Sequence, residues 1–179
     1  MPLQVEIAFG ALDIFCFHFA STSSRLLSFF LESLSFFLGS DILDVGCGSG
    51  ILSVVAAKLG ASRVVGIEID DVAVSVGASN VKANEAYGVE VIKGTLPHPD
   101  VTECTFDITV ANISSREIIK LAPHLVESVR PEGVLIVSGL LQETAGSVVE
   151  ALSTRGSAVI GTLTEQDWVA LVVRAPSPS

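Results

Sequence analysis

Positive charge is scarce in this chain of 179 residues. Lysine and arginine together number 10 against 20 aspartates and glutamates, so the formal net charge is −10. Proteins that bind nucleic acids tightly carry a basic face or stripe, and no such stripe is visible in the sequence. The composition therefore argues against direct nucleic-acid binding. It suits a protein whose partner is basic, or one whose charge serves only to keep it in solution.

Cysteine is also sparse. Cys16, Cys47 and Cys104 are odd in number, lie far apart, and form neither a Cys-x-x-Cys pair nor a cluster with histidine. Structural zinc sites need four closely spaced ligands of these types. We therefore expect no metal site, and a protein that works in a reducing compartment such as the cytoplasm. Cys47 has no basic neighbour in sequence, so we interpret it as a small filler rather than a nucleophile.

Long uncharged runs are missing, although 49% of the residues are hydrophobic. Every window of about 18 residues contains charged or turn-forming residues, so the sequence predicts no membrane-spanning helix and no membrane partner. The N-terminus has neither the basic start of a secretory signal nor the arginines of a mitochondrial one. High apolar content without a span is typical of a parallel sheet that is buried on both faces.

The most informative stretch is residues 41–52, with the sequence DILDVGCGSGIL. An apolar run ends in Asp44, three glycines follow at alternate positions (Gly46, Gly48 and Gly50), and a helical apolar pattern then begins. This order predicts a strand, a tight loop and a helix. Glycines let the loop backbone approach a ligand closely, and the helix N-terminus offers free N–H groups.

The glycine spacing separates two classes of ligand. Dinucleotide-binding loops have the pattern Gly-x-Gly-x-x-Gly, in which the third glycine packs the helix against the strand. Here the pattern is Gly-x-Gly-x-Gly, and Ile51 occupies the position of that third glycine. Asp44 would repel a pyrophosphate, whereas it can accept hydrogen bonds from a cationic amine or from N–H groups of the loop. Both features favour S-adenosylmethionine, which has an amino-acid head group and no phosphate.

A second acidic residue, Glu68, ends the next predicted strand, 63–68, about 20 residues past the glycine loop. An acid at this spacing is suited to bind the two hydroxyls of a ribose. The alternative is that Glu68 belongs, with Asp70 and Asp71, to an acidic turn that starts the next helix. We expect Asp70 and Asp71 to have this helix-starting role, and Glu68 to bind ribose.

Asn112 ends a further predicted strand, 106–112, at the same edge of the sheet as the glycine loop. In an open α/β sheet, ligands bind outside the carboxyl ends of the strands. An amide placed there can both donate and accept, so it can hold a target amine or the cofactor. The alternative is a turn asparagine that caps the helix expected from near Ser114 or Ser115.

Several segments together resemble one enzyme family. They are 43–52, 65–70 and 110–113, and the segments 133–139 and 168–174 also fit. On these residues the chain resembles the class I S-adenosylmethionine-dependent methyltransferases, and more narrowly the PrmA family, which methylates the eleventh large-subunit ribosomal protein. The glycine segment is common to many methyltransferases. Val-Ala-Asn-Ile with a later Ser-Gly-Leu-Leu is more particular to this family.

The resemblance implies an S-adenosylmethionine-dependent N-methyltransferase that acts on a lysine or amino group of a basic protein, such as a ribosomal protein. It implies no metal, and a catalytic role for Asn112. The positions that match the family's cofactor-binding residues are Ser24, Asp44, Gly46, Gly48, Gly50, Glu68 and Asn112.

The chain departs from the family in two places. Residues 11–24 replace most of a loop that usually reads Thr-Gly-x-His-x-Thr-Thr, through either a diverged loop or a wrongly joined gene segment. Ser24 then occupies the position of the second threonine, and His18 is not at the position of the family's histidine. From the position of the matching segments we also expect the family's N-terminal substrate domain to be missing from this sequence.

Two alternatives to an active methyltransferase stay open. The altered loop leaves room for a methyltransferase-like protein that binds the cofactor but turns over poorly. A nucleotide-dependent oxidoreductase is the other alternative, and Ile51 and Asp44 argue against it.

Alternating strands and helices predict an α/β fold with a doubly wound, mostly parallel, seven-stranded Rossmann-like sheet and helices on both faces. Residues 1–40 are expected to form an apolar segment and a helix that packs on the core. Residues 41–174 form the methyltransferase domain, and 175–179 a disordered tail. Within the domain we expect a helix over 115–130 that is kinked at Pro123, followed by a turn at 131–133.

Overall fold

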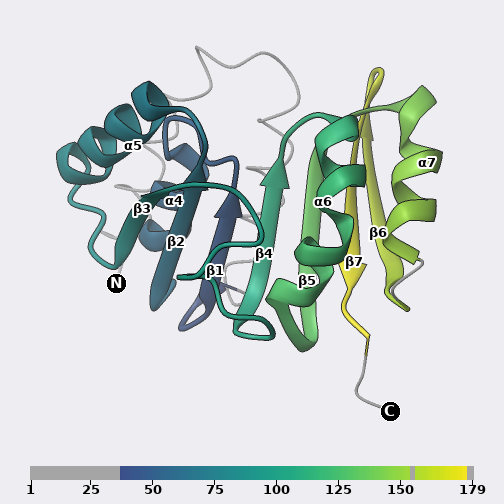
Figure 1. The fold of residues 1–179 in the computed structure, drawn as a ribbon, viewed down its shortest axis with the longest axis horizontal. Coiled ribbons are helices and arrows are strands. Elements are labelled where there is room, and N and C mark those ends of the chain that lie inside the picture. The colour runs from purple at the N-terminus through teal and green to yellow at the C-terminus, as the bar shows by residue number, and fades with distance from the viewer. Residues whose placement is uncertain (1–36, 154–155, 177–179) are drawn as a thin grey trace, which may run out of the picture.

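The computed structural model describes residues 37–153 and 156–176. Together they form one seven-stranded sheet with helices on both faces (Figure 1). The strands are β1 (Asp41–Val45), β2 (Arg63–Glu68), β3 (Val89–Lys93), β4 (Phe106–Asn112), β5 (Val129–Leu141), β6 (Ala158–Glu165) and β7 (Trp168–Arg174). The helices are α4 (Ile51–Lys58), α5 (Asp71–Ala83), α6 (Ser115–Ser128) and α7 (Gln142–Ser153).

The sheet is mixed but mostly parallel. Its strand order is β3-β2-β1-β4-β5-β7-β6, and only β7 runs antiparallel to its two neighbours, β5 and β6. The chain first moves outward from β1 to β3 and then returns to place β4 on the other side of β1. The doubly wound fold predicted from the sequence is confirmed. The gap between β1 and β4 is the switch point beside which open α/β sheets bind ligands.

Side chains alternate between two apolar layers, one on each face of the sheet. Along β1, Leu43 and Val45 belong to a buried cluster that includes Leu125 of α6. Ile42 points the other way, into a cluster that includes Ala56 of α4. A strand buried on both faces must be apolar at nearly every position, which explains the high hydrophobic content of the chain.

Two helices begin with side-chain caps, and the sequence anticipated the first of them. Asp70 caps α5, because its Oδ1 accepts a hydrogen bond of 2.8 Å from the N–H of Ala73. Asp71 lies in the first turn of the same helix, where a negative charge offsets the helix dipole. Ser114 caps α6 by accepting from the N–H of Glu117 at 3.3 Å. The cap of α6 is therefore Ser114, and Asn112 stays available for another role.

The boundary between α6 and β5 differs from the sequence-based expectation. α6 continues through Pro123 but ends at Ser128, two residues before the predicted end at Arg130. β5 starts at Val129, which is buried and pairs with Phe106 of β4. The turn predicted at 131–133 is instead a bulge within β5, where four residues stand opposite one residue of β4. Burial of a β-branched residue in the sheet outweighs the local helical pattern.

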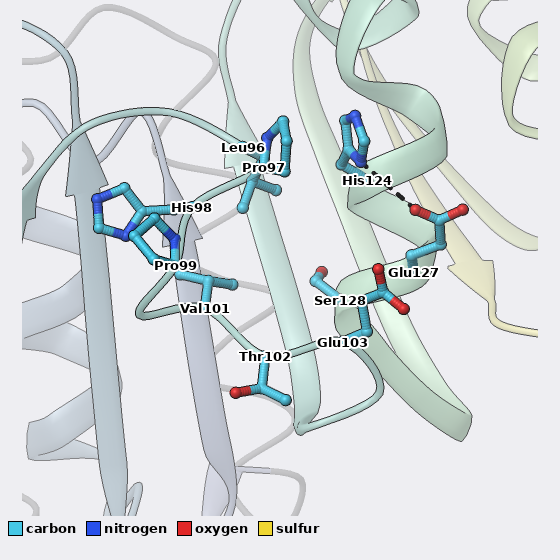
Figure 2. A pocket seen from close by; sticks show the side chains of 10 residues that line it. All are labelled: Leu96, Pro97, His98, Pro99, Val101, Thr102, Glu103, His124, Glu127 and Ser128. Carbon is cyan, nitrogen blue, oxygen red and sulfur yellow. Dashed lines mark ion pairs between the residues drawn. The ribbon is translucent and has the colours of Figure 1, made fainter.

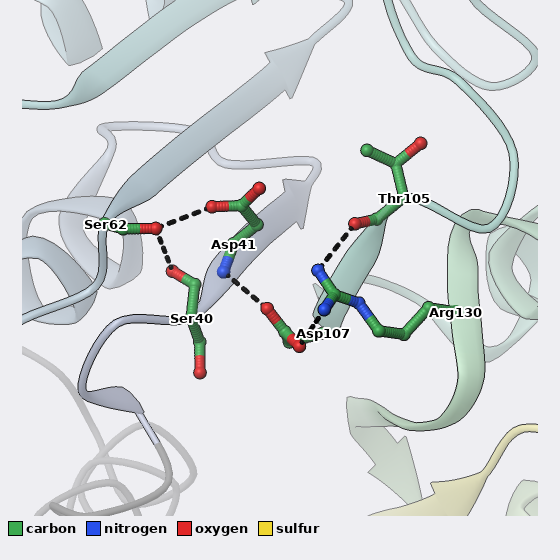
Figure 3. A network of polar contacts seen from close by, with 6 residues as sticks. All are labelled: Ser40, Asp41, Ser62, Thr105, Asp107 and Arg130. Carbon is green, nitrogen blue, oxygen red and sulfur yellow. Dashed lines mark hydrogen bonds and ion pairs between the residues drawn. The ribbon is translucent and has the colours of Figure 1, made fainter.

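A polar network ties together the edge of the sheet that lies opposite the carboxyl ends of β1, β2 and β4 (Figure 3). Asp107 accepts from the N–H of Asp41 at 2.8 Å and forms an ion pair of 2.8 Å with Arg130. Arg130 also donates to the carbonyl oxygen of Thr105 at 3.0 Å, and the Ser62 hydroxyl donates to Asp41 at 2.6 Å. These contacts join the starts of β1, β2, β4 and β5, so we interpret the network as structural.

Some predictions fall at or beyond the limits of the described residues. Ala175, placed in the disordered tail by the sequence, is buried, and its N–H donates to the carbonyl oxygen of Gly133 at 3.1 Å. Ser24, His18 and the rest of 1–36 lie outside the described part of the chain, as do 177–179. Among the helices of 37–153 and 156–176, none is long and apolar enough to cross a membrane.

Candidate functional site

Three of the predicted site elements converge at one edge of the sheet. The glycine loop 46–50 follows β1, Glu68 ends β2, and Asn112 ends β4. β1 lies between β2 and β4 (Figure 1), and all three run parallel. The loop therefore emerges between the strand ends that carry Glu68 and Asn112. The fold thus brings together every predicted site residue that lies in the described part of the chain.

The glycine loop adopts a backbone that side chains would not tolerate. Gly46, Gly48 and Gly50 have φ values of 71°, 53° and 73°, in the left-handed region that favours glycine. A Cβ at Gly46 would overlap the side chain of Ile113, and one at Gly50 would lie 3.2 Å from the Cα of Gly77. At Gly48 no atom of residues 37–153 or 156–176 lies within 4 Å of the Cβ position. Two of the glycines are therefore needed for packing, while the third leaves open space for a ligand.

Helix α5 holds this loop from outside, through two residues that the sequence analysis missed. A Cβ at Gly77 would lie 3.2 Å from the carbonyl oxygen of Gly48, so the helix approaches the loop backbone directly. Asn80 donates from its Nδ2 to the carbonyl oxygen of Ser49 at 2.9 Å. The available signal was a glycine in the middle of a helix, which lowers helix stability and so indicates a close contact.

Asp44 lies beneath the loop rather than on its surface. It is 2% exposed, and the Ser53 hydroxyl of α4 donates to its Oδ2 at 2.6 Å. Burial raises the pKa of Asp44 to about 6; the hydrogen bonds from Ser53 oppose this rise, and the charge of Glu68 adds to it. Asp44 anchors the start of α4, and its effect on a ligand would come from its charge rather than from contact.

Glu68 joins the glycine loop to the turn that follows β2. Its Oε2 accepts from the N–H of Gly48 at 3.0 Å. Its Oε1 accepts from the N–H groups of Ile69 and Asp70, at 2.8 and 3.0 Å. The turn role considered from the sequence is therefore present. Each carboxylate oxygen can accept two hydrogen bonds, so Oε2 keeps a lone pair for a hydroxyl, and the ribose contact stays a prediction.

Cys47 and Gly66 fill the space between the loop and β2. Cys47 is buried, and burial, together with the charges of Asp44 and Glu68, raises the pKa of its thiol to about 12. The thiol therefore stays protonated and is a poor nucleophile, in line with the filler role expected. A Cβ at Gly66 would lie 2.9 Å from Cys47 Sγ and 3.1 Å from Ser53 Oγ. Gly66, which sequence reasoning did not single out, makes room for both groups.

Asn112 faces the end of the neighbouring strand β5. It is half-buried, and its register partner is Ser138. Gly139 follows with a φ of 81°, and a Cβ there would lie 2.7 Å from the carbonyl oxygen of Ile113 and 3.2 Å from Asn112 Oδ1. No hydrogen bond joins the amide of Asn112 to another residue of 37–153 or 156–176. The amide is thus positioned at the site edge with its donors and its acceptor available.

A cavity of about 400 Å³ lies elsewhere, between the β3–β4 connection and α6 (Figure 2). It is lined by Leu96, Pro97, His98, Pro99, Val101, Thr102, Glu103, His124, Glu127 and Ser128. His124, expected at the surface, is half-buried there, with its Nδ1 3.4 Å from Glu127 Oε2. None of the predicted site residues reaches this cavity. Within the described ranges, no three His, Cys, Asp or Glu side chains are grouped so as to hold a metal ion.

Comparison with known proteins gives a consistent family assignment. The family model described as ribosomal protein L11 methyltransferase (PrmA) matches residues 27–176. The chain belongs to this family. The ribosomal protein L11 methyltransferase of Pelotomaculum thermopropionicum is 44% identical over 137 residues, and that of Ruminiclostridium cellulolyticum 40% over 138. Each alignment covers 76% of this chain and 44% of the relative, so this PrmA-family chain spans less than half of their length.

Solved structures show the same fold. The crystal structure of ribosomal protein L11 methylase from Lactobacillus delbrueckii subsp. bulgaricus matches with a TM-score of 0.72 and 28% identity, covering 76% of this chain and 70% of that one. An RNA methyltransferase from Salinibacter ruber, crystallised with S-adenosyl-L-homocysteine, matches with a TM-score of 0.70 and 21% identity, covering 89% and 96%. The PrmA-family chain thus has the architecture of methyltransferases.

Proposed function

We propose that this PrmA-family chain is an S-adenosylmethionine-dependent N-methyltransferase that acts on a lysine or amino group of a basic protein. The observation that carries the proposal is the open space at Gly48, in a left-handed glycine loop that is flanked by the carboxylates of Asp44 and Glu68. It lies beside the switch point of the sheet, where ligands of such folds bind.

The residues present fit this cofactor better than a dinucleotide. Asp44 is buried below the loop and Glu68 lies beside it, so the site presents negative charge. S-adenosylmethionine carries a cationic sulfonium and an ammonium group, which this charge attracts, whereas a pyrophosphate would be repelled. We assign the loop backbone to the amino-acid part and Glu68 to the ribose hydroxyls. When bound, the cofactor supplies an activated methyl group.

Asn112 would orient the nucleophile. A lysine or α-amine attacks only as the neutral amine, with its lone pair in line with the methyl group. The Oδ1 of Asn112 can accept an N–H of that amine and so direct the lone pair away from the amide and toward the methyl group. The amide stands at the end of β4, next to the glycine loop, with no other hydrogen bond in the described structure. Orientation of this kind needs no ionisable side chain.

A ribosomal protein is the substrate that we propose, in the cytoplasm. The relatives in this family carry the name ribosomal protein L11 methyltransferase. The net charge of −10 also complements a basic protein, since opposite charges steer two partners together.

The test combines calorimetry with a methylation assay. We expect S-adenosylhomocysteine to bind and to raise the melting temperature, because a ligand of the native state stabilises it, and NADH to do neither. Radiolabelled methyl transfer to ribosomal protein L11 should follow. His124→Ala, which alters the other cavity, is the matched control and should leave ligand affinity unchanged.

The possible results separate the three interpretations. Binding of NADH without binding of S-adenosylhomocysteine would support the oxidoreductase and overturn the proposal. Binding of S-adenosylhomocysteine with no methyl transfer to any basic protein would support the catalytically impaired methyltransferase-like protein.

A further inference from the structure

Ser138 is a buried polar residue whose hydroxyl has no hydrogen-bond partner in the described part of the chain. Its side chain is 0% exposed, and its Oγ makes no hydrogen bond to residues 37–153 or 156–176. Nearly all buried polar groups in proteins are hydrogen-bonded, and an unpaired one costs stability. The four preceding residues of β5, 134–137, are all buried and apolar. A hydroxyl at this position therefore contributes nothing to the core that an alanine would not contribute.

The hydroxyl lies beside the candidate catalytic amide. Ser138 is the register partner of Asn112 on the parallel strand β4, so the two side chains leave the same face of the sheet. Adjacent strands are about 4.8 Å apart, which puts a hydroxyl and an amide within reach of each other after a change of rotamer. Neither group has a hydrogen bond among the described residues. The two available groups are therefore next to one another at the edge of the sheet that carries the site.

Close packing fixes the backbone at the end of β5, but it does not explain why residue 138 is a serine. Gly139 has no room for a side chain, because a Cβ would lie 2.7 Å from the carbonyl oxygen of Ile113. The contact accounts for the glycine in the Ser-Gly-Leu-Leu segment, and it clamps the end of β5 against the turn after Asn112. It leaves the hydroxyl of Ser138 without a structural purpose among the described residues.

We propose that Ser138 is a positioning residue that acts through Asn112; this inference rests on the proposed methyltransferase function. When cofactor and acceptor are bound, Ser138 Oγ accepts a hydrogen bond from Asn112 Nδ2. An amide has its donor and its acceptor on opposite sides, so anchoring Nδ2 aims Oδ1 at the acceptor amine. The hydroxyl thereby fixes the orientation of the amide, and the amide fixes that of the amine.

The first test compares stability, affinity and turnover in Ser138→Ala. We expect an equal or higher melting temperature and an affinity for S-adenosylhomocysteine within about twofold of the unmodified protein. We expect kcat on ribosomal protein L11 to fall by about 10- to 100-fold, since small losses of orientation have large effects on rate. Ser138→Cys, similar in size but a weak hydrogen-bond partner, should behave like Ser138→Ala. A purely structural serine would instead lower the melting temperature.

The second test asks whether Ser138 acts through Asn112. In a double-mutant cycle, Ser138→Ala should cause no further loss of kcat in the Asn112→Ala background, because residues that act as a unit are non-additive. A further readout needs no turnover. With S-adenosylhomocysteine and a lysine-rich peptide bound, the side-chain amide protons of Asn112 should exchange with solvent more slowly in the unmodified protein than in Ser138→Ala.

The outcomes separate this inference from the proposed function. Unchanged kcat and unchanged amide exchange in Ser138→Ala, in a protein that binds S-adenosylhomocysteine, would overturn the positioning role alone. The positioning role would also be overturned if Ser138→Ala lowered kcat by the same factor in the unmodified protein and in the Asn112→Ala variant. Failure of the unmodified protein to bind S-adenosylhomocysteine would overturn the proposed function and this inference with it.

Discussion

Asp44 and Ser53 are joined by a hydrogen bond of 2.6 Å in the interior of the protein, directly beneath the glycine loop. The bond connects Asp44, the next-to-last residue of β1, to Ser53 in the first turn of α4. It therefore helps to fix the position of the loop relative to the sheet. It also keeps a carboxylate whose pKa is raised to about 6 by burial close to the site. A buried charge here is unfavourable for folding and favourable for a cationic ligand.

Asp44→Asn should therefore stabilise the protein near neutral pH and weaken the binding of the cofactor. The folded state binds a proton at Asp44 with a pKa of about 6 instead of 3.8, so stability falls as pH rises from about 4 to about 6 and is level above that. The difference corresponds to about 3 kcal/mol at most. Urea unfolding of both proteins from pH 4 to 7 measures it, and the variant should lack this fall. A less stable variant at pH 7 would contradict the expectation.

Glu68→Ala should lower the affinity for S-adenosylhomocysteine by about 1–3 kcal/mol, through loss of charge-assisted bonds to the ribose. Stability should also fall, because three N–H groups lose their acceptor. Calorimetry and urea unfolding separate the two effects. If stability falls while the affinity is unchanged, Glu68 serves only the turn.

Gly77→Val should loosen the glycine loop, because even a Cβ would lie 3.2 Å from the carbonyl oxygen of Gly48. We expect the affinity for S-adenosylhomocysteine to fall by about tenfold, or about 1.4 kcal/mol, because the loop backbone is displaced from the ligand. Gly146→Ala is the control for replacement of a helical glycine, in α7, where a Cβ meets no atom of the described residues within 4 Å. It should stabilise the protein by about 0.5–1 kcal/mol without changing affinity. Equal affinities in both variants would show that α5 does not support the loop.

Asp107→Asn should destabilise the fold without affecting ligand binding. It removes the charge that pairs with Arg130, at the edge of the sheet opposite the site. Because Asp107 is 31% exposed and Arg130 43%, solvent screening limits the loss to about 1 kcal/mol. Asp100→Asn, at a 74% exposed carboxylate, is the control with the same chemical change. A large loss of ligand affinity in Asp107→Asn would mean that the two edges of the sheet are coupled.

The sequence predicts where the candidate site residues lie in the fold when their positions depend on local order. Alternate glycines after an apolar strand favour a tight loop, and the strand ends at Glu68 and Asn112 follow from short apolar runs. A parallel sheet then brings these ends to one edge. For this reason the fold, and the convergence of the candidate site residues at one edge of the sheet, can be predicted from the sequence.

The residues that were missed depend on contacts across the sheet. Gly66 and Gly77 are required by atoms of Cys47, Ser53 and Gly48. A glycine in the middle of a helix indicates a close contact at Gly77, but the sequence does not show which atoms make that contact. The start of β5 at Val129 depends on pairing with β4. The position of a strand end can be predicted from its own residues, whereas the space next to it depends on its neighbours.

The contact between α5 and the glycine loop has a consequence for how the native protein opens. Gly77 lies against the backbone of Gly48, and Asn80 binds the carbonyl oxygen of Ser49, so neither segment can leave its place alone. The loop and α5 should act as one cooperative unit of partial unfolding, whose amides exchange with a common free energy. A ligand bound at the loop would then slow exchange along a helix that need not touch it.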